Sequence, residues 1–166
     1  LNFIYMKEIK LTKGFTTIVD DEDFEKLNKI KWYITKGRSG YYARNRSIGA
    51  MHRFITNCPQ GMIVDHRDHN TLNNQKSNLR LCNYSENNSN RIPSNNSVSK
   101  YLGVSVVKIK SRHTKLNTIY TYYMVGIIKN GKKVYQTTFK NEIDAAKQYD
   151  IWAKEVHGEF ANLNFK

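Results

Sequence analysis

Apolar and polar residues alternate along much of the chain, a pattern that predicts short strands. Residues 7–19 alternate on either side of Lys13-Gly14, which predicts two strands joined by a turn. Trp32-Tyr33 and Tyr41–Ala43 predict two further strands, with residues 36–40 as their hairpin turn. The first third of the chain therefore reads as a set of small antiparallel strands.

Two short helices are expected among these strands. Residues 20–25 hold five acids, and we expect a turn and an electronegative first helical turn there rather than a metal site. Residues 49–56 predict a short helix with Met51, Phe54 and Ile55 directed inward.

The middle of the chain predicts two strands and a helix. Residues 62–65 form the first strand and residues 79–82 the second, with a loop over residues 70–74. We expect Ser85 to cap a helix whose first turn holds Asn87. Residues 91–100 contain proline, serines and asparagines without apolar periodicity, which predicts a linker.

The last third predicts three strands and one long helix. The strands cover residues 101–110, 118–128 and 132–139, and Asn130-Gly131 suits a type I′ turn between the last two. Asn141 caps a helix over residues 142–157 that ends at Gly158. One face of this helix can cover the sheet, because it gathers Ala146, Tyr149, Ala153 and Val156.

Charge changes the picture by indicating a polyanionic partner. The 166 residues carry a net charge of +13, and the isoelectric point is about 9.7. No acid occurs between Asn87 and Asn141. We expect a sheet that is positive on one face, with salt-dependent phosphate contacts from five cations: Lys108, Lys110, Arg112, Lys132 and Lys133.

Cysteine usage and hydropathy indicate the cellular compartment that we expect for the protein. Cys58 and Cys82 form no CxxC pair, which disfavours a structural zinc site and a disulfide framework. No apolar run is long enough for a transmembrane helix, and Met6 is a candidate natural start. We expect a cytoplasmic protein with reduced thiols, in a bacterial host cell if a phage encodes it.

One group of residues has the types and the spacing expected of a catalytic site. Asp65-His66 is followed by Asn78, 12 residues after the histidine, and by Asn87, 21 residues after it. A histidine suits activation of a water, and a divalent cation with hard oxygen ligands suits charge neutralisation in phosphodiester hydrolysis. Adjacent side chains of a strand point to opposite faces, so this chemistry requires the backbone to bring Asp65 and His66 to one site.

The ordered segments VDH, LNN, SNLRL, ENN and NR resemble the HNH (ββα-metal) motif of phage and mobile-intron homing endonucleases. The resemblance implies that His66 is the general base and that Asn78 ties the loop holding it. It also implies that Asp65 and Asn87 bind one Mg²⁺ or Mn²⁺. The family often carries His-Arg at the position of His52 and Arg53.

His52 is either a support for the site or an ordinary histidine on a helix face, and the sequence leaves both open. Three arginines are candidate phosphate contacts: Arg53, Arg80 and Arg91.

The last third resembles an AP2 DNA-binding domain. The resemblance rests on Tyr101–Val104, Thr138-Phe139, Asp144–Ala146, Tyr149-Asp150 and Ala161–Phe165. It implies a three-stranded sheet packed on one helix and bound to double-stranded DNA. The chain departs from the family at Ser105 and Val106, where plant members usually have a base-reading arginine.

Together these features predict an α+β protein: small N-terminal strands plus a ββα-metal module over residues 1–90, a linker over 91–100, and an AP2-like domain over 101–166. The predicted activity is metal-dependent, site-directed cleavage of DNA by a homing-type monomer without an obligate protein partner. One active site per chain predicts a nick. The alternatives are a non-catalytic DNA-binding regulator with a decayed HNH module and an RNA-binding protein.

Overall fold

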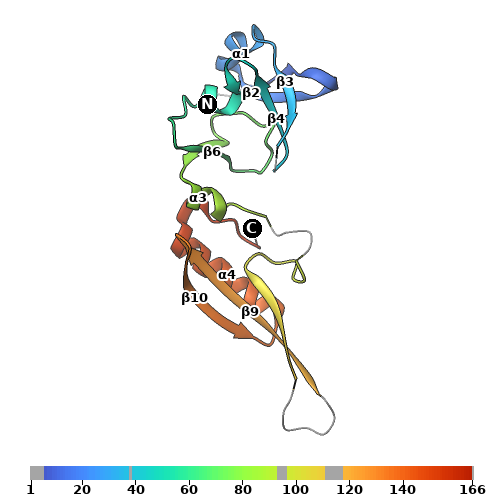
Figure 1. Ribbon diagram of the computed structural model, residues 1–166, viewed down its shortest axis with the longest axis vertical. Coiled ribbons are helices and arrows are strands. Elements are labelled where there is room, and N and C mark those ends of the chain that lie inside the picture. The colour runs from blue at the N-terminus through green and yellow to red at the C-terminus, as the bar shows by residue number, and fades with distance from the viewer. Residues whose placement is uncertain (1–5, 38, 93–96, 111–117, 166) are drawn as a thin grey trace. The chain divides into compact units, whose positions relative to one another are not determined.

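The computed structural model describes residues 6–37, 39–92, 97–110 and 118–165. The chain forms two compact units, Leu1–Asn87 and Asn88–Lys166. Each unit combines small antiparallel sheets with helices, so the protein is of the α+β class (Figure 1). The predicted linker, residues 91–100, lies partly outside the described residues. Among the described residues, no helix has the length and apolar character to cross a membrane.

The first unit begins with a two-stranded hairpin and a helix. β1 (Met6–Lys10) pairs antiparallel with β2 (Thr16–Asp20) across a 3-10 turn, Thr12–Gly14. Lys13 adopts a positive φ of 61° at this turn. α1 (Asp21–Asn28) follows, and its first turn holds three of the acids, as the sequence predicts: Asp21, Glu22 and Asp23.

A second sheet and a short helix complete the core of this unit. β3 (Tyr33–Lys36), β4 (Tyr41–Asn45) and β5 (Gly49–Ala50) form a sheet in that order, and α2 (Met51–Ile55) follows directly. The buried core draws on all of these elements: Ile9, Leu11, Val19, Leu27, Trp32, Ala43 and Met51. The predicted strands and the predicted helix are confirmed.

Two strands and a helix follow. β6 (Ile63–His66) pairs antiparallel with β7 (Leu79–Cys82), whose bounds match the prediction, and α3 (Tyr84–Ser89) comes next. The prediction that Ser85 caps this helix is wrong. Asn83 Oδ1 accepts from Glu86 N at 2.9 Å, and Glu86 Oε2 accepts from Asn83 N at 2.8 Å. This reciprocal pair is a capping box, which satisfies two backbone donors that Ser85 alone cannot satisfy.

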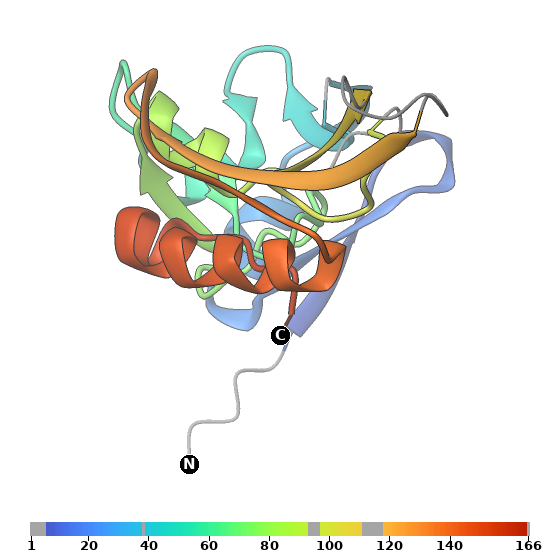
Figure 2. The same ribbon diagram turned by 90° about the horizontal axis from the view of Figure 1, so that it is seen from below.

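The second unit is a three-stranded antiparallel sheet with one helix against it. β8 (Val104–Lys110), β9 (Ile119–Lys129) and β10 (Lys132–Phe139) lie in the order β10-β9-β8. α4 (Glu142–His157), with the bounds the sequence predicts, lies along one face of this sheet (Figure 2). Asn130 and Gly131 have φ values of 51° and 76°, which confirms the predicted turn.

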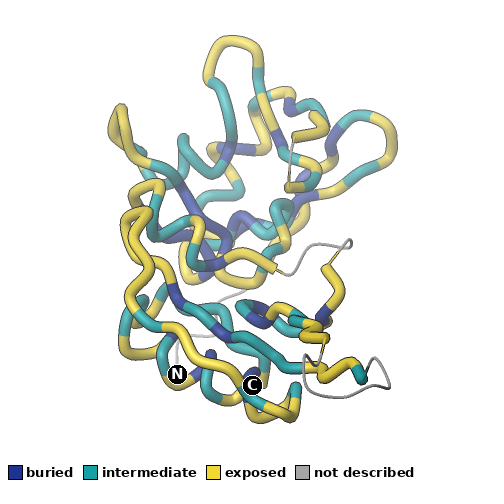
Figure 3. The backbone as a smooth tube through the Cα atoms, turned by 60° about the horizontal axis from the view of Figure 1, so that its bottom comes forward, coloured by how far each residue is buried: buried dark blue, intermediate teal, exposed yellow. Residues whose placement is uncertain are grey.

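The core of the second unit lies between its sheet and α4. It consists of strand residues and one face of the helix: Leu102, Val104, Val125, Ile127, Ala145, Ala146, Tyr149 and Ala153. A Cβ on Gly103 would collide with the ring of Tyr149, so the close approach of sheet and helix requires glycine there. Figure 3 shows such buried residues in short stretches inside each unit, with exposed residues along the turns.

Candidate functional site

The loop that follows β6 is held by Asn78. Its Oδ1 accepts from the backbone N of Asp68 at 3.0 Å, and its Nδ2 donates to Asp68 Oδ1 and Asn73 O, both at 2.9 Å. Burial alone would raise the pKa of Asp68, but hydrogen bonds from Asn73, Asn70 and Asn78 outweigh it and lower that pKa. Asn78 therefore ties together the loop that leaves His66, which is the place its predicted role requires.

His66 is buried at the end of β6, among other rings. Its ring lies edge-on to that of His52, with centroids 5.2 Å apart, and to that of Tyr42, at 6.3 Å. Burial lowers the pKa of His66, against the opposing effects of a hydrogen bond with Asn74 and the charges of Asp68 and Asp65. A neutral imidazole at ordinary pH is the form that can accept a proton.

His52 contacts the candidate base directly. Its ring centroid is also 5.6 Å from that of Tyr42, so the three rings form one cluster. Burial, then the positive charges of His66, Arg53 and Arg44, lower the pKa of His52 to about 3. The sequence leaves two interpretations of His52 open, and these contacts favour support of the site by a neutral ring.

Asn74 and Thr17 complete the surroundings of His66. Asn74 Oδ1 lies 3.5 Å from His66 Nε2, and Asn74 Nδ2 donates to Thr17 Oγ1 at 2.7 Å. Thr17 Oγ1 in turn donates to the backbone oxygen of Leu72 at 2.7 Å. Asn74 belongs to the LNN segment, but the sequence gives it no role. Thr17 lies 57 residues before Asn74, and nothing in the spacing of the motif indicates Thr17.

Asp65 has a different set of contacts from His66. It lies opposite Arg80 in the β6–β7 register, and its Oδ2 accepts from Arg80 Nε at 2.8 Å and lies 2.7 Å from Nη2. Both residues are buried. The expectation that Arg80 contacts a phosphate is therefore corrected, because the register makes it the buried partner of Asp65. Asp65 thus pairs with Arg80, while its neighbour His66 packs against the rings of His52 and Tyr42.

The chemistry of Asp65 and Asn87 fits a hard divalent cation. Asn87 lies in α3, half-buried, with its backbone N donating to Asn83 O at 3.0 Å. Arg80 contacts Oδ2 of Asp65 through Nε and Nη2, which fixes the orientation of this carboxylate. A carboxylate and an amide oxygen are the donors that Mg²⁺ accepts while it keeps several waters.

A separate acidic cluster lies at the start of α1. Among the described residues, one group of three acidic, histidine or cysteine side chains has potential ligand atoms that all lie within 4.8 Å of one another. This group is Asp20, Glu22 and Asp23. Lys76 Nζ lies 2.7 Å from Glu22 Oε1 and 3.0 Å from Asp23 Oδ2. A lysine thus occupies the position of a cation at two of these three carboxylates.

Arg53 is used within the first unit. Its guanidinium donates to the backbone oxygens of Met62 at 2.7 Å, Pro59 at 3.0 Å and Cys58 at 3.3 Å. These three bonds hold the turn that leads into β6. A phosphate contact by Arg53 would have to compete with them.

The sheet of the second unit has a side that faces α4 and an open side. Val104 and Val125 are paired in register and both are buried against α4, so the alternation of side chains places the next pair, Ser105 and Met124, on the open side. Among the described strand residues, the open side carries one cation, Lys133, and is otherwise neutral: Ser105, Val107, Ile109, Tyr120, Tyr122, Met124, Gly126, Ile128, Gln136 and Thr138. The expected positive sheet face is thus corrected.

The same alternation assigns sides to the predicted cations. Lys108 and Lys110 follow Val104 by even numbers, so they lie on the α4 side of β8. Lys132 is paired with Lys129, whose Nζ donates to Val156 O of α4 at 3.0 Å. Lys133 is paired with Ile128 and lies on the open side. Arg112 lies outside the described residues.

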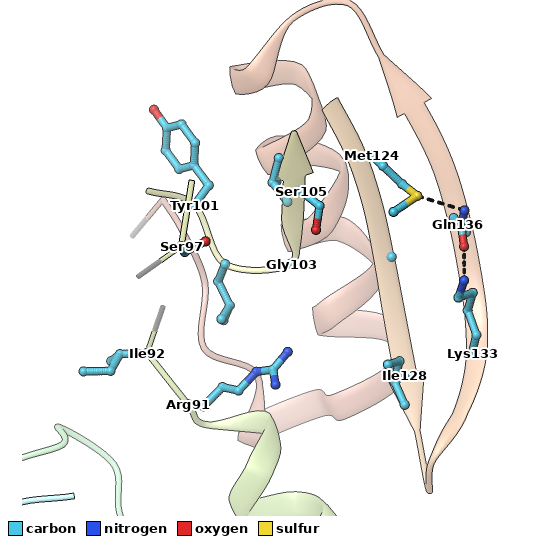
Figure 4. A pocket seen from close by; sticks show the side chains of 13 residues that line it. Arg91, Ile92, Ser97, Tyr101, Gly103, Ser105, Met124, Ile128, Lys133 and Gln136 are labelled. Atoms are coloured by element: carbon cyan, nitrogen blue, oxygen red, sulfur yellow. Dashed lines mark hydrogen bonds between the residues drawn. The ribbon is translucent and has the colours of Figure 1, made fainter. Parts of the chain in front are cut away.

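A hollow of about 410 Å³ lies on the open side of this sheet (Figure 4). Two cations, Arg91 and Lys133, line it together with Ser105, Met124 and Gln136. Lys133 Nζ contacts Gln136 Oε1, and Gln136 Nε2 lies 3.0 Å from Met124 Sδ. The lining of the hollow therefore combines neutral side chains with two positive charges.

Comparison with known proteins identifies the class of protein that carries this site. The family model described as HNH endonuclease matches residues 51–89, which include α2, the β6–β7 hairpin and α3. A protein of Acanthamoeba polyphaga mimivirus, described as an uncharacterized HNH endonuclease, is 32% identical over 169 residues, spanning 97% of this chain and 81% of the relative. No solved structure matches.

The chain belongs to the HNH endonuclease family and is a nuclease. Nucleases of this family act on DNA and generally use a divalent metal.

Proposed function

We propose that this chain is a metal-dependent, site-directed DNA endonuclease of the homing type, with His66 as its general base. The observation that carries the proposal is the position of His66. It is buried among His52, Tyr42 and Asn74 at the end of β6, directly after the carboxylate of Asp65. Its lowered pKa keeps the imidazole neutral, so it can accept a proton from water.

In this mechanism the residues of the first unit divide the work. His66 takes a proton from the water that attacks the phosphorus in line with the leaving oxygen. Asn78 keeps the loop after His66 in place through its three hydrogen bonds. Asp65 and Asn87 would hold one Mg²⁺ or Mn²⁺, which supplies neutralisation of charge at the leaving oxygen. Arg80 fixes the orientation of the Asp65 carboxylate.

The second unit is proposed to bind the double-stranded target in the manner of an AP2 domain. Its sheet has an open side with a hollow that Arg91 and Lys133 help to line, and the chain carries no acid between Asn87 and Asn141. Lys108, Lys110 and Lys132 lie on the other side of the strands, where they are proposed to contact phosphates that flank the sheet. With one active site per chain, a monomer cuts one strand.

The test is conversion of supercoiled plasmid that carries candidate intron-flanking DNA, with Mg²⁺, with Mn²⁺ and with EDTA. Open circles that need the metal are the expected product of a nicking enzyme. Linear product at early times would instead indicate paired cuts. Unchanged plasmid, with the same protein still shifting that DNA in a gel, would contradict the proposed function.

A further inference from the structure

We propose that Asn74 and Thr17 are positioning residues that fix the tautomer of His66, with the proton on Nε2 and the proton-accepting lone pair on Nδ1. This inference deepens the proposed function and rests on it for the role of His66 as the base. The assignment of the tautomer itself rests on the hydrogen bonds alone.

The direction of a buried hydrogen-bond chain determines the assignment. The backbone oxygen of Leu72 is only an acceptor, so the Thr17 hydroxyl, 2.7 Å away, must give it its one hydrogen. The Thr17 oxygen can then only accept from Asn74, so the amide atom that lies 2.7 Å from it is the NH₂ group.

The other end of the same amide faces His66. With its NH₂ group on Thr17, Asn74 turns Oδ1 toward His66 Nε2, 3.5 Å away. An amide oxygen cannot donate, so the imidazole nitrogen that faces it must carry a hydrogen. In neutral imidazole this leaves the lone pair on Nδ1. The backbone oxygen of Leu72 thus fixes the direction of each hydrogen bond in the series, and the last of these bonds determines which nitrogen of His66 is basic.

The hydrogen bonds that link His66, Asn74, Thr17 and Leu72 cannot easily reverse their donor-to-acceptor direction. Thr17 is 0% exposed and Asn74 is 1% exposed, so solvent does not replace a lost partner. A flipped Asn74 would set its oxygen against the Thr17 oxygen, whose hydrogen is already committed to Leu72. Leaving such buried groups unpaired is destabilising, because they have lost their hydrogen bonds to water as well.

The backbone fixes the same residues. Asn74 N donates to Ile18 O at 2.8 Å, and Ile18 N donates to Leu72 O at 2.9 Å. These two bonds dock the segment Leu72–Asn74 on β2 beside Thr17, so the amide and the hydroxyl are held at a set separation. β2 therefore contributes to the site although it lies far from the HNH motif in the sequence.

The direct test is the tautomer of His66 in the full chain, labelled with ¹⁵N at histidine and free of metal, at pH 8. Long-range ¹H–¹⁵N correlation spectra show which ring nitrogen carries the proton, and His66→Gln identifies the signals. We expect the Nε2-H form in the wild type. A wild-type spectrum of the Nδ1-H form would overturn the inference, whatever the variants do.

Two variants separate positioning from packing. Thr17→Val keeps the shape and removes the hydroxyl, so the Asn74 amide can turn, and we expect an Nδ1-H population to appear. Asn74→Leu removes the acceptor at similar volume and should do the same. Thr17→Ser keeps the hydroxyl and should restore the wild-type spectrum. If the folded Thr17→Val and Asn74→Leu chains both keep pure Nε2-H, then another group sets the tautomer and the inference is wrong.

Cleavage kinetics give a second readout. For Thr17→Val we expect a loss in kcat of about 10- to 100-fold, the size seen when the hydrogen-bond partner of a metal-bound histidine is removed, with little change in KM. Thr17→Ser should cleave as the wild type does. Failure of the proposed function would give a different result. His66→Ala would then cleave at the wild-type rate, while the wild-type spectrum could still show the proton on Nε2.

Discussion

Asp65 and Arg80 lie directly opposite each other on β6 and β7 and form a buried ion pair, with Arg80 Nε 2.8 Å from Asp65 Oδ2. The antiparallel register places them together, and burial makes each dependent on the other. A carboxylate left without its partner in this environment is costly, because it has lost its water and its compensating charge. Arg80 thus orients the carboxylate of Asp65, which is a proposed metal ligand.

Arg80→Ala should destabilise the fold by about 3–5 kcal/mol, the usual cost of breaking a buried pair from one side. Urea unfolding measures this, with the exposed Lys10→Ala as a control expected to change stability by at most about 0.5 kcal/mol. Unchanged stability with a smaller salt dependence of DNA binding would mean that Arg80 contacts phosphate after all.

Asn78→Ala should loosen the loop after His66. The variant loses the acceptor for Asp68 N and two donated bonds, and it should lose about 1–3 kcal/mol of unfolding free energy. Hydrogen exchange is the sharper measurement, because the Asp68 amide should exchange faster in the variant. An Asp68 amide protected as in the wild type would refute the loop-holding role, and the exposed Asn88→Ala is the matched control.

The histidine cluster predicts loss of stability in acid. Burial first, then nearby positive charge, lowers the pKa of His52 from 6.5 to about 3 in the folded chain. Between these values the unfolded chain binds a proton that the folded chain does not, so stability is full above about pH 6.5 and falls as pH decreases toward 3. His52→Phe keeps a ring against His66 and should lose less stability between pH 6.5 and pH 4.5. Identical pH dependence in both chains would show that His52 is not the source.

Lys133 and Lys129 lie on adjacent strands but on opposite sides of the sheet, which makes them a matched pair. If the open side meets DNA, Lys133→Ala should weaken binding uniformly across sequences and reduce the salt slope by about 1. Lys129→Ala should leave that slope unchanged. The opposite result, measured by anisotropy at several salt concentrations, would contradict a phosphate contact by Lys133 on the open side.

Local signals account for the elements that the sequence predicts correctly. α4 has a cap at Asn141, helical apolar spacing and Gly158 at its end, and each of these acts within a few residues. The turn at Asn130-Gly131 is equally local, because two positive φ angles restrict it to such residues. The roles of Asp65, His66 and Asn87 follow from the resemblance of a local motif and stay predictions.

The parts that the sequence does not predict depend on register and on distant contacts. The Asp65–Arg80 pair and the sides taken by Lys108 and Lys133 follow from strand register, which charge counts do not contain. Thr17 reaches the site only because the loop at Asn74 docks on β2.

Cleavage by His66→Ala tests the central claim most directly. Single-turnover rates should be compared with those of the wild type on the same target DNA, at Mg²⁺ and protein concentrations that saturate both. The general-base role predicts a loss of about 10²- to 10⁴-fold in the rate, with DNA affinity and thermal unfolding close to those of the wild type. Cleavage at the wild-type rate by the folded variant would contradict the account, because another group would then activate the water.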